Sequence, residues 1–166
     1  METSTIPGWS DFFTAAAGVA GALAGLVFVG LSINLTRILQ LPSAIGRAAE
    51  TLFVLAGVLA IDLVALVPAQ SERHLAALLL VAAVPVWSLP AIAQVRALGA
   101  DFPGRKLLVP MRMLLHQAGT LPIVVGALGL FFGYEGVGIG FIAAGCILAI
   151  LVAMLSAWVL LVEILR

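Results

Sequence analysis

Residues 137–161 read VGIGFIAAGCILAILVAMLSAWVLL and contain no charged side chain. A helix of about 20 apolar residues crosses the hydrocarbon core of a bilayer, which is roughly 30 Å thick. A charge-free run of this length is longer than the apolar stretches of helices buried in small soluble domains. It therefore predicts a transmembrane helix.

The composition of the whole chain agrees with this prediction. Of its 166 residues, 63% are hydrophobic and 10% are charged, whereas a soluble domain has roughly 45–50% apolar and about 25% charged residues. A chain of this size has too little interior to hide the excess from water. We therefore expect the lipid bilayer to be its solvent. The net charge of zero gives no indication of nucleic acid binding.

Four further stretches are similarly long and apolar, so the chain is predicted to be an all-α integral membrane protein. It is expected to form a single domain, residues 1–166, built as a bundle of five transmembrane helices. The predicted spans are Phe12–Leu35, Ala44–Val67, Leu75–Val95, Met111–Phe132 and Val137–Leu161.

Punctuating residues mark the ends of some spans. Ser43 is expected to cap the second helix, and Pro68 to end it. Pro85 and Pro90 predict a kink or a break in the third. No positive charge precedes the first apolar run, so this run is expected to remain in the mature protein.

The distribution of cations predicts the orientation of the bundle. Of the eight Lys and Arg residues, only Arg73 falls on one side of the predicted membrane. Cytoplasmic loops are enriched in Lys and Arg, so we expect the N-terminus outside and the C-terminus in the cytoplasm. The cations on the other, cytoplasmic side are Arg37, Arg47, Arg96, Arg105, Lys106, Arg112 and Arg166.

Small residues recur at a spacing that lets helices approach closely. Ala17, Gly21 and Gly25 repeat every four residues in the first span, and Gly140 and Ala144 do so in the fifth. Such rows favour close helix packing, either within one chain or between chains. Because five short helices enclose little volume, we expect any solute path to form between subunits of a homo-oligomer.

Three ionisable side chains fall well inside the predicted spans. Asp62 lies about 9 Å from the outer end of the second helix, where a carboxylate must be protonated, paired or hydrated. His116 lies about as far from the inner end of the fourth helix, at nearly the depth of Glu50. The separation of Asp62 and His116 along the membrane normal is therefore roughly 15–20 Å, and no direct pair between them is expected.

Asp62 has three possible roles. It lines a pore or proton-linked path, it makes a structural hydrogen bond to a neighbouring helix, or it is an exposed residue at the interface.

The other polar candidates form a layer just inside the cytoplasmic face. Glu50 is expected to pair with Arg47, Arg96, Arg112 or His116. The layer either anchors helix ends by hydrogen bonding or forms a vestibule or gate around Glu50 and His116. Together with Asp62, the candidate polar sites are Glu50, His116, Asn34, Arg37 and Arg112.

A membrane-embedded enzyme is the least favoured function, because only Asp62, Glu50 and His116 could do acid–base work. Cys146 is the only cysteine, and the two histidines are far apart in the sequence, so a Cys/His metal centre is not expected. A Gly-flanked serine and a phosphate-binding loop are also missing. We therefore predict no catalytic residue, cofactor or metal.

Residues 9–35, WSDFFTAAAGVAGALAGLVFVGLSINL, carry a family resemblance. They are similar to the first helix of a family of small, uncharacterised bacterial integral membrane proteins. The matching positions are Trp9, Asp11, Phe12, Phe13, Leu23–Val29 and Ser32–Leu35. Some members are labelled modulators of the FtsH protease, a role for which these residues offer no physical basis. The resemblance implies a bacterial inner-membrane location and no catalytic motif.

Two functions are compatible with these features. The first is a homo-oligomeric channel or pore for ions or small solutes, formed between subunits and lined by the candidate polar sites. The second is an accessory or regulatory subunit of another membrane complex. Such a subunit would bind a membrane-protein partner through its small-residue faces and would not conduct.

Overall fold

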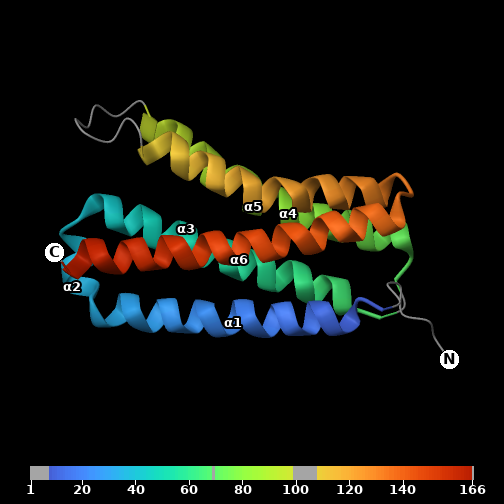
Figure 1. The fold of residues 1–166 in the computed structure, drawn as a ribbon, viewed down its shortest axis with the longest axis horizontal. Coiled ribbons are helices and arrows are strands. Elements are labelled where there is room, and N and C mark those ends of the chain that lie inside the picture. Colours follow the sequence, from blue (N-terminus) through green and yellow to red (C-terminus); the bar gives the residue numbers. More distant parts are fainter. Residues whose placement is uncertain (1–7, 69, 99–107, 166) are drawn as a thin grey trace.

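Helices make up most of residues 8–68, 70–98 and 108–165, which are the residues described by the computed structural model (Figure 1). The helices are α1 (Ser10–Ile33), α2 (Leu35–Leu39), α3 (Pro42–Leu66), α4 (Glu72–Leu98), α5 (Leu108–Phe131) and α6 (Glu135–Leu165). All but the short α2 are long and apolar enough to cross a membrane. No strand occurs in these ranges. The prediction of an all-α chain with five candidate transmembrane helices is confirmed for them.

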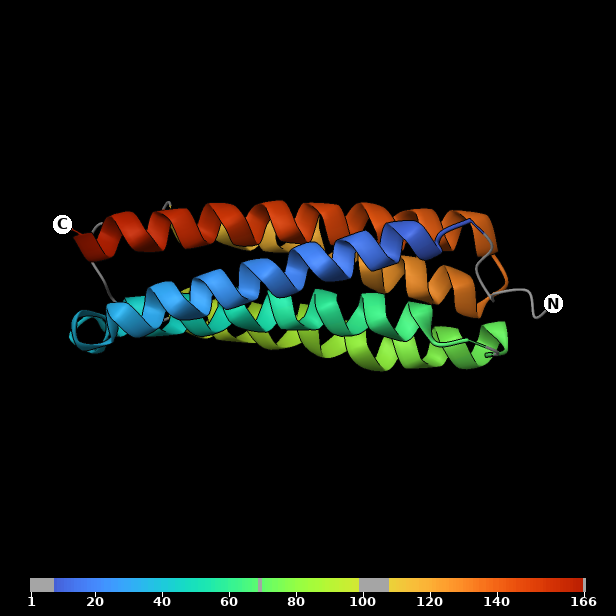
Figure 2. The ribbon, with the colours of Figure 1, turned by 90° about the horizontal axis from the view of Figure 1, so that it is seen from below.

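The five long helices run along a common axis and alternate in direction (Figures 1 and 2). The most extensive contact joins α5 and α6, followed by the contacts of α4 with α5 and of α1 with α3. α1 crosses obliquely over α3 and α6, as Figure 2 shows. It is the least covered of the five, with 11% of its most apolar window buried.

The two ends of the bundle differ in charge. The basic end, where α1 stops and α3 begins, carries Arg37, Arg47, Arg96 and Arg112. The acidic end, where α4 and α6 begin, carries Asp11, Glu72 and Glu135 together with Arg73.

The boundaries of α3 and α1 differ from the predictions by one or two residues. α3 begins at Pro42, with Leu41 as its N-cap, so the prediction of Ser43 as the cap is wrong. Proline is favoured at the first helical position because its ring fixes φ and its missing N–H would be unbonded there anyway. α1 ends at Ile33, and Asn34 separates it from α2, which the sequence analysis did not predict.

The turn between α5 and α6 is tight because of a single glycine. Gly133 has φ +87°, a conformation that glycine adopts without steric penalty. The N–H of Tyr134 donates to the carbonyl of Gly129 at 2.9 Å, and the N–H of Gly133 donates to Leu130 at 3.1 Å. These two bonds form a Schellman motif, which ends α5 and lets α6 start at Glu135.

Glycines spaced by seven residues bring α5 and α6 into backbone contact. A Cβ atom added at Gly126 would lie 2.5 Å from the carbonyl oxygen of Gly138 and 2.7 Å from the nitrogen of Ile142. At Gly119 it would lie 3.0 Å from the Cα of Ala149. Small residues at such positions permit close approach of membrane helices and the van der Waals contact that stabilises them.

α4 is continuous from Glu72 to Leu98 although it contains Pro85 and Pro90. The structure therefore does not show the predicted alternative of a break. Pro90 has no N–H to donate to Val86, the residue four positions earlier. In membrane helices, groups from neighbouring helices satisfy carbonyls that a proline leaves free.

One apolar cluster occupies the interior, and apolar side chains also cover the outside. Phe13, Leu79, Ile123 and Ile142 are among its buried members, which come from every long helix. Leu26 and many other large apolar residues are exposed. An apolar interior within an apolar exterior is expected of a bundle whose surroundings are lipid.

Candidate functional site

The buried polar side chains of the described residues face the inside of one chain. They are Thr51, Asp62, Gln94, His116 and Thr120, and each is at most 3% exposed. They come from α3, α4 and α5. A pore between subunits would not reach them, because the helices of their own chain enclose them.

Glu50 connects three helices near the basic end. Its Oε2 forms an ion pair with the Arg112 guanidinium of α5. Its Oε1 accepts a hydrogen bond from the Gln94 amide of α4. Of the four predicted partners of Glu50, the structure brings Arg112 to it. The side chains of Arg112 and Glu50 are 34% and 15% exposed, so the pair lies at the rim of the buried region.

His116 lies one turn further into α5 and bonds to α4. Its Nε2 is 3.0 Å from the carbonyl oxygen of Trp87. A carbonyl only accepts, so Nε2 carries the proton and donates. Trp87 lies three residues before Pro90, in the helical turn where the missing N–H of Pro90 leaves the Val86 carbonyl without its usual donor.

Two further residues hold this arrangement. The Thr120 hydroxyl donates to the carbonyl of His116 at 2.8 Å, and its oxygen lies 3.5 Å from His116 Nε2. The indole N–H of Trp87 donates to Gln117 Oε1 at 2.6 Å.

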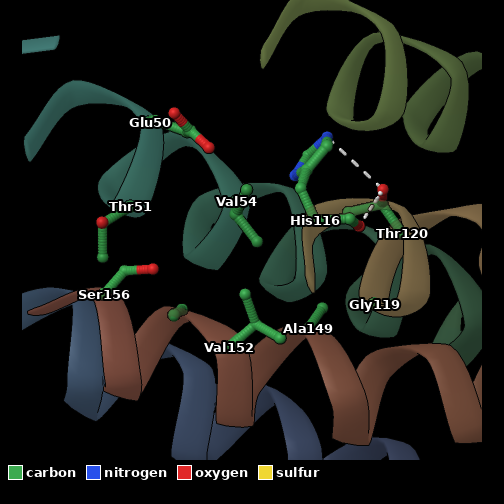
Figure 3. Close-up of a pocket in the computed structure, with 10 residues that line it drawn as sticks. Glu50, Thr51, Val54, His116, Gly119, Thr120, Ala149, Val152 and Ser156 are labelled. Carbon is green, nitrogen blue, oxygen red and sulfur yellow. Dashed lines mark hydrogen bonds between the residues drawn. The ribbon is translucent and has the colours of Figure 1, made fainter. Parts of the chain in front are cut away.

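A small cavity lies beside these groups, between α3, α5 and α6 (Figure 3). It offers about 20 Å³ to the centre of a water molecule, which is room for roughly one water. In Figure 3 the His116 ring nitrogen that makes no marked bond is on the side of the ring turned toward Glu50 and the cavity. The lining residues are Glu50, Thr51, Val54, His116, Gly119, Thr120, Ala149, Val152, Ala153 and Ser156.

Asp62 lies further along α3, toward the acidic end. It is 0% exposed, and neither carboxylate oxygen has a hydrogen-bond partner among the described residues. The Cys146 thiol of α6 faces it, but it does not reach normal hydrogen-bond geometry. Of the three predicted roles of Asp62, the exposed position is wrong, because α3 turns this side chain into the bundle. The structural hydrogen bond to a neighbouring helix stays a prediction, with the Cys146 thiol of α6 as the group that faces the carboxyl.

The Glu50–Arg112 pair sets the register between α3 and α5, and with it the depth of each polar group. If the two paired residues lie at one level, His116 is about 6 Å and Thr120 about 12 Å further along the axis. Asp62 is about 18 Å along, so it lies roughly 12 Å beyond His116. Their separation is thus smaller than the predicted 15–20 Å, since the helices are not in the register assumed from their ends.

Two predicted candidates lie apart from this cluster. The Asn34 amide donates to the carbonyl of Gly30 at 2.9 Å, within the last turn of α1. Arg37 is exposed on α2. The structure therefore brings Glu50, Arg112 and His116 together, but not Asn34 or Arg37.

Four residues of this region were not predicted from the sequence: Thr51, Trp87, Thr120 and Ser156. Thr120 follows His116 by one helical turn, so helical spacing could have identified it. Thr51 follows Glu50 directly and therefore points to another side of the helix, so spacing gave no signal for it. Trp87 acts through its backbone carbonyl, which side-chain patterns do not reveal.

The predicted packing residues face different ways. Ala17 is buried, and a Cβ atom at Gly21 would contact Leu59 of α3 at 3.9 Å. A Cβ atom at Gly25 or Gly140 would meet nothing within 4 Å, and Ala144 is exposed. These last three residues do not pack closely within the described chain, so close packing through them between chains stays a prediction.

Among the described residues, no group of three or more His, Cys, Asp or Glu side chains is placed to hold a metal ion. Comparison with known proteins found no matching family model, curated protein or solved structure.

Proposed function

We propose that this chain is a multi-pass membrane protein that carries a small ion along a path inside its own helix bundle. The observation that carries the proposal is the burial of His116 and Asp62 within one chain, with Glu50 at the rim of the same region. Ionisable groups in the membrane interior are costly and are typical of ion and proton paths. The proposal keeps the channel function expected from the sequence but moves its path from the interface between subunits to the interior of one subunit.

The cavity restricts what passes. The cavity has room for about one water molecule. The proposed species is therefore a proton or another ion no larger than a water molecule. Hydroxyl groups of Thr51, Thr120 and Ser156 line it, and these can accept or donate hydrogen bonds along a path.

The proposed location and orientation rest on the sequence. We propose that the basic end faces the cytoplasm, because Lys and Arg are enriched in cytoplasmic loops. The resemblance of the first helix supports a bacterial inner membrane.

Proton flux into liposomes that contain the purified chain tests the proposal. Ser156→Leu places apolar atoms in the cavity, and we expect it to lower the flux about tenfold, which corresponds to a barrier increase of about 1.4 kcal/mol. Met154→Leu is the matched control, because Met154 is exposed on the same helix. A wild-type chain without flux, or an unchanged flux in Ser156→Leu, would contradict the proposal.

The second candidate is an accessory subunit of another membrane complex. It is favoured by α1, which is mostly uncovered and has Gly18, Ala22 and Gly25 on its exposed side. Small residues of this kind suit close contact with another membrane helix. This reading predicts no flux and a stoichiometric partner in the native mass of the protein extracted in mild detergent.

A further inference from the structure

Among the buried polar residues that the structure describes, Asp62 is the one whose two side-chain oxygens both lack a hydrogen-bond partner of ordinary geometry. An ionised carboxylate removed from water and left without a partner costs several kcal/mol. The neutral acid avoids most of this cost. The burial and the missing partners therefore indicate that Asp62 holds a proton in the structure described.

The surroundings of Asp62 exclude other charges. The titratable group that faces it is Cys146 of α6. Val58 and Ala65, one turn before and after it on α3, are apolar and buried. Both belong to the apolar cluster of the interior, to which α1, α4, α5 and α6 also contribute.

These surroundings also decide which cation Asp62 can bind. Metal cations such as Ca²⁺ or Mg²⁺ need about six oxygen ligands. Among the described residues, Asp62 belongs to no group of three or more His, Cys, Asp or Glu side chains that could hold a metal ion. A proton needs one oxygen only.

The two ends of the bundle offer Asp62 different access. The apolar cluster lies on both sides of Asp62, with Phe13 and Leu75 toward the acidic end and Val58 toward the basic end, but no other buried polar residue that the structure describes lies on the acidic side. Toward the basic end, the cavity reaches Val54 and Thr120, and Thr120 is about 6 Å short of the level of Asp62. Figure 3 shows His116 and Thr120 side by side at the cavity wall.

We propose that Asp62 is a proton-binding site that exchanges its proton with the basic end of the bundle, through the cavity beside His116 and Thr120. Binding adds a proton to one carboxylate oxygen, and release returns it to water at the basic end. On the acidic side of Asp62, the described helices contribute no further buried polar side chain. The inference deepens the proposed function, because it identifies the proton as the ion carried, and it names the residue that holds it.

Labelling by dicyclohexylcarbodiimide tests the proposal. This reagent enters bilayers and adds to protonated carboxyl groups, and mass spectrometry of the peptides locates the adduct. We expect Asp62 of the wild-type chain in liposomes to be labelled and the adduct to disappear in Asp62→Asn. Asp11→Asn, at an exposed position on α1, serves as the control and leaves the Asp62 adduct unchanged.

The sidedness of access is measured with different pH values inside and outside the liposomes. A cysteine introduced at exposed Tyr134 of the acidic end reports the orientation of the chain through an impermeant maleimide. Alkaline pH at the basic end should lower labelling of Asp62 about tenfold for each pH unit above the midpoint of its titration. The same pH at the acidic end should change it less than twofold. Ser156→Leu should slow the response to the basic end.

The outcomes separate the two proposals. Labelling that follows the acidic end, or that ignores pH on both sides, overturns the proton site. So does a wild-type chain that shows neither an adduct at Asp62 nor a protonated-carboxyl infrared band that is lost in Asp62→Asn. Side-dependent labelling without proton flux supports the site and refutes transport, whereas flux with Asp62 ionised throughout refutes the site alone.

Discussion

At the scale of single residues, Glu50 organises the basic end of the bundle. Its two oxygens contact different helices, Arg112 of α5 and Gln94 of α4. One carboxylate thereby ties α3 to both helices that carry the His116–Trp87 contact. Removing one member of such a pair leaves the other without its counter-charge, and the loss exceeds the value of the pair itself.

A double-mutant cycle with Glu50→Gln and Arg112→Gln measures this coupling. We predict a coupling energy on the order of 1 kcal/mol, because polar contacts in membrane proteins have average values near 0.6 kcal/mol and this one is only partly exposed. The measurement is the free energy of unfolding in mixed detergent micelles with increasing dodecyl sulfate. Strictly additive effects of the two substitutions would show that the ion pair does not form in the membrane.

At the scale of elements, the α5–α6 contact depends on glycines that no side chain can replace. The Cβ atom of alanine at Gly126 would meet backbone atoms of α6 at 2.5–2.7 Å. A rotamer change of the neighbour cannot relieve contacts with backbone, so the two helices would have to separate.

Gly126→Ala should therefore lower the free energy of unfolding by roughly 1–3 kcal/mol, the usual cost of overpacking. Gly140→Ala is the matched control on α6, because nothing lies within 4 Å of the added Cβ atom. We expect it to stay within about 0.5 kcal/mol of the wild type. Equal effects of the two substitutions in the same unfolding measurement would contradict the packing described for α5 and α6.

The sequence predicted the five long helices because length and apolar content are local properties. It did not predict α2, whose Leu35–Leu39 turn is too short to show a period. It identified the four-residue rows of small residues but not the contact of Gly126 with Gly138. Spacing shows which residues share a helix face, whereas the neighbouring helices decide which face is covered.

The polar site was predictable to a similar degree. Helical depth indicated that Glu50 and His116 lie near the same end and that Asp62 is further away. Depth does not indicate rotation about the helix axis, so the expectation of a path between subunits could not be tested from sequence. The structure turns Asp62 and His116 inward, and it adds the Trp87 carbonyl as a partner.

At the scale of the whole molecule, the bundle keeps its polar groups inside and presents apolar residues outward. From the basic end, the interior contains the polar groups, then the cavity and then Asp62, while the apolar cluster extends from the cavity to the acidic end. In the proposal above, this order gives one chain a proton site without a contribution from a second subunit. Contacts through Gly18 or Gly25 would then affect assembly and not the path itself.

Proton flux measured at limiting dilution of the chain in liposomes tests this claim most directly. At an average of less than one chain per vesicle, we predict that the fraction of conducting vesicles rises in proportion to the amount of chain, and that Asp62→Asn abolishes the conducting fraction. A conducting fraction that rises with the square or a higher power of the amount of chain would contradict a path within the single chain and would return it to the interface between subunits.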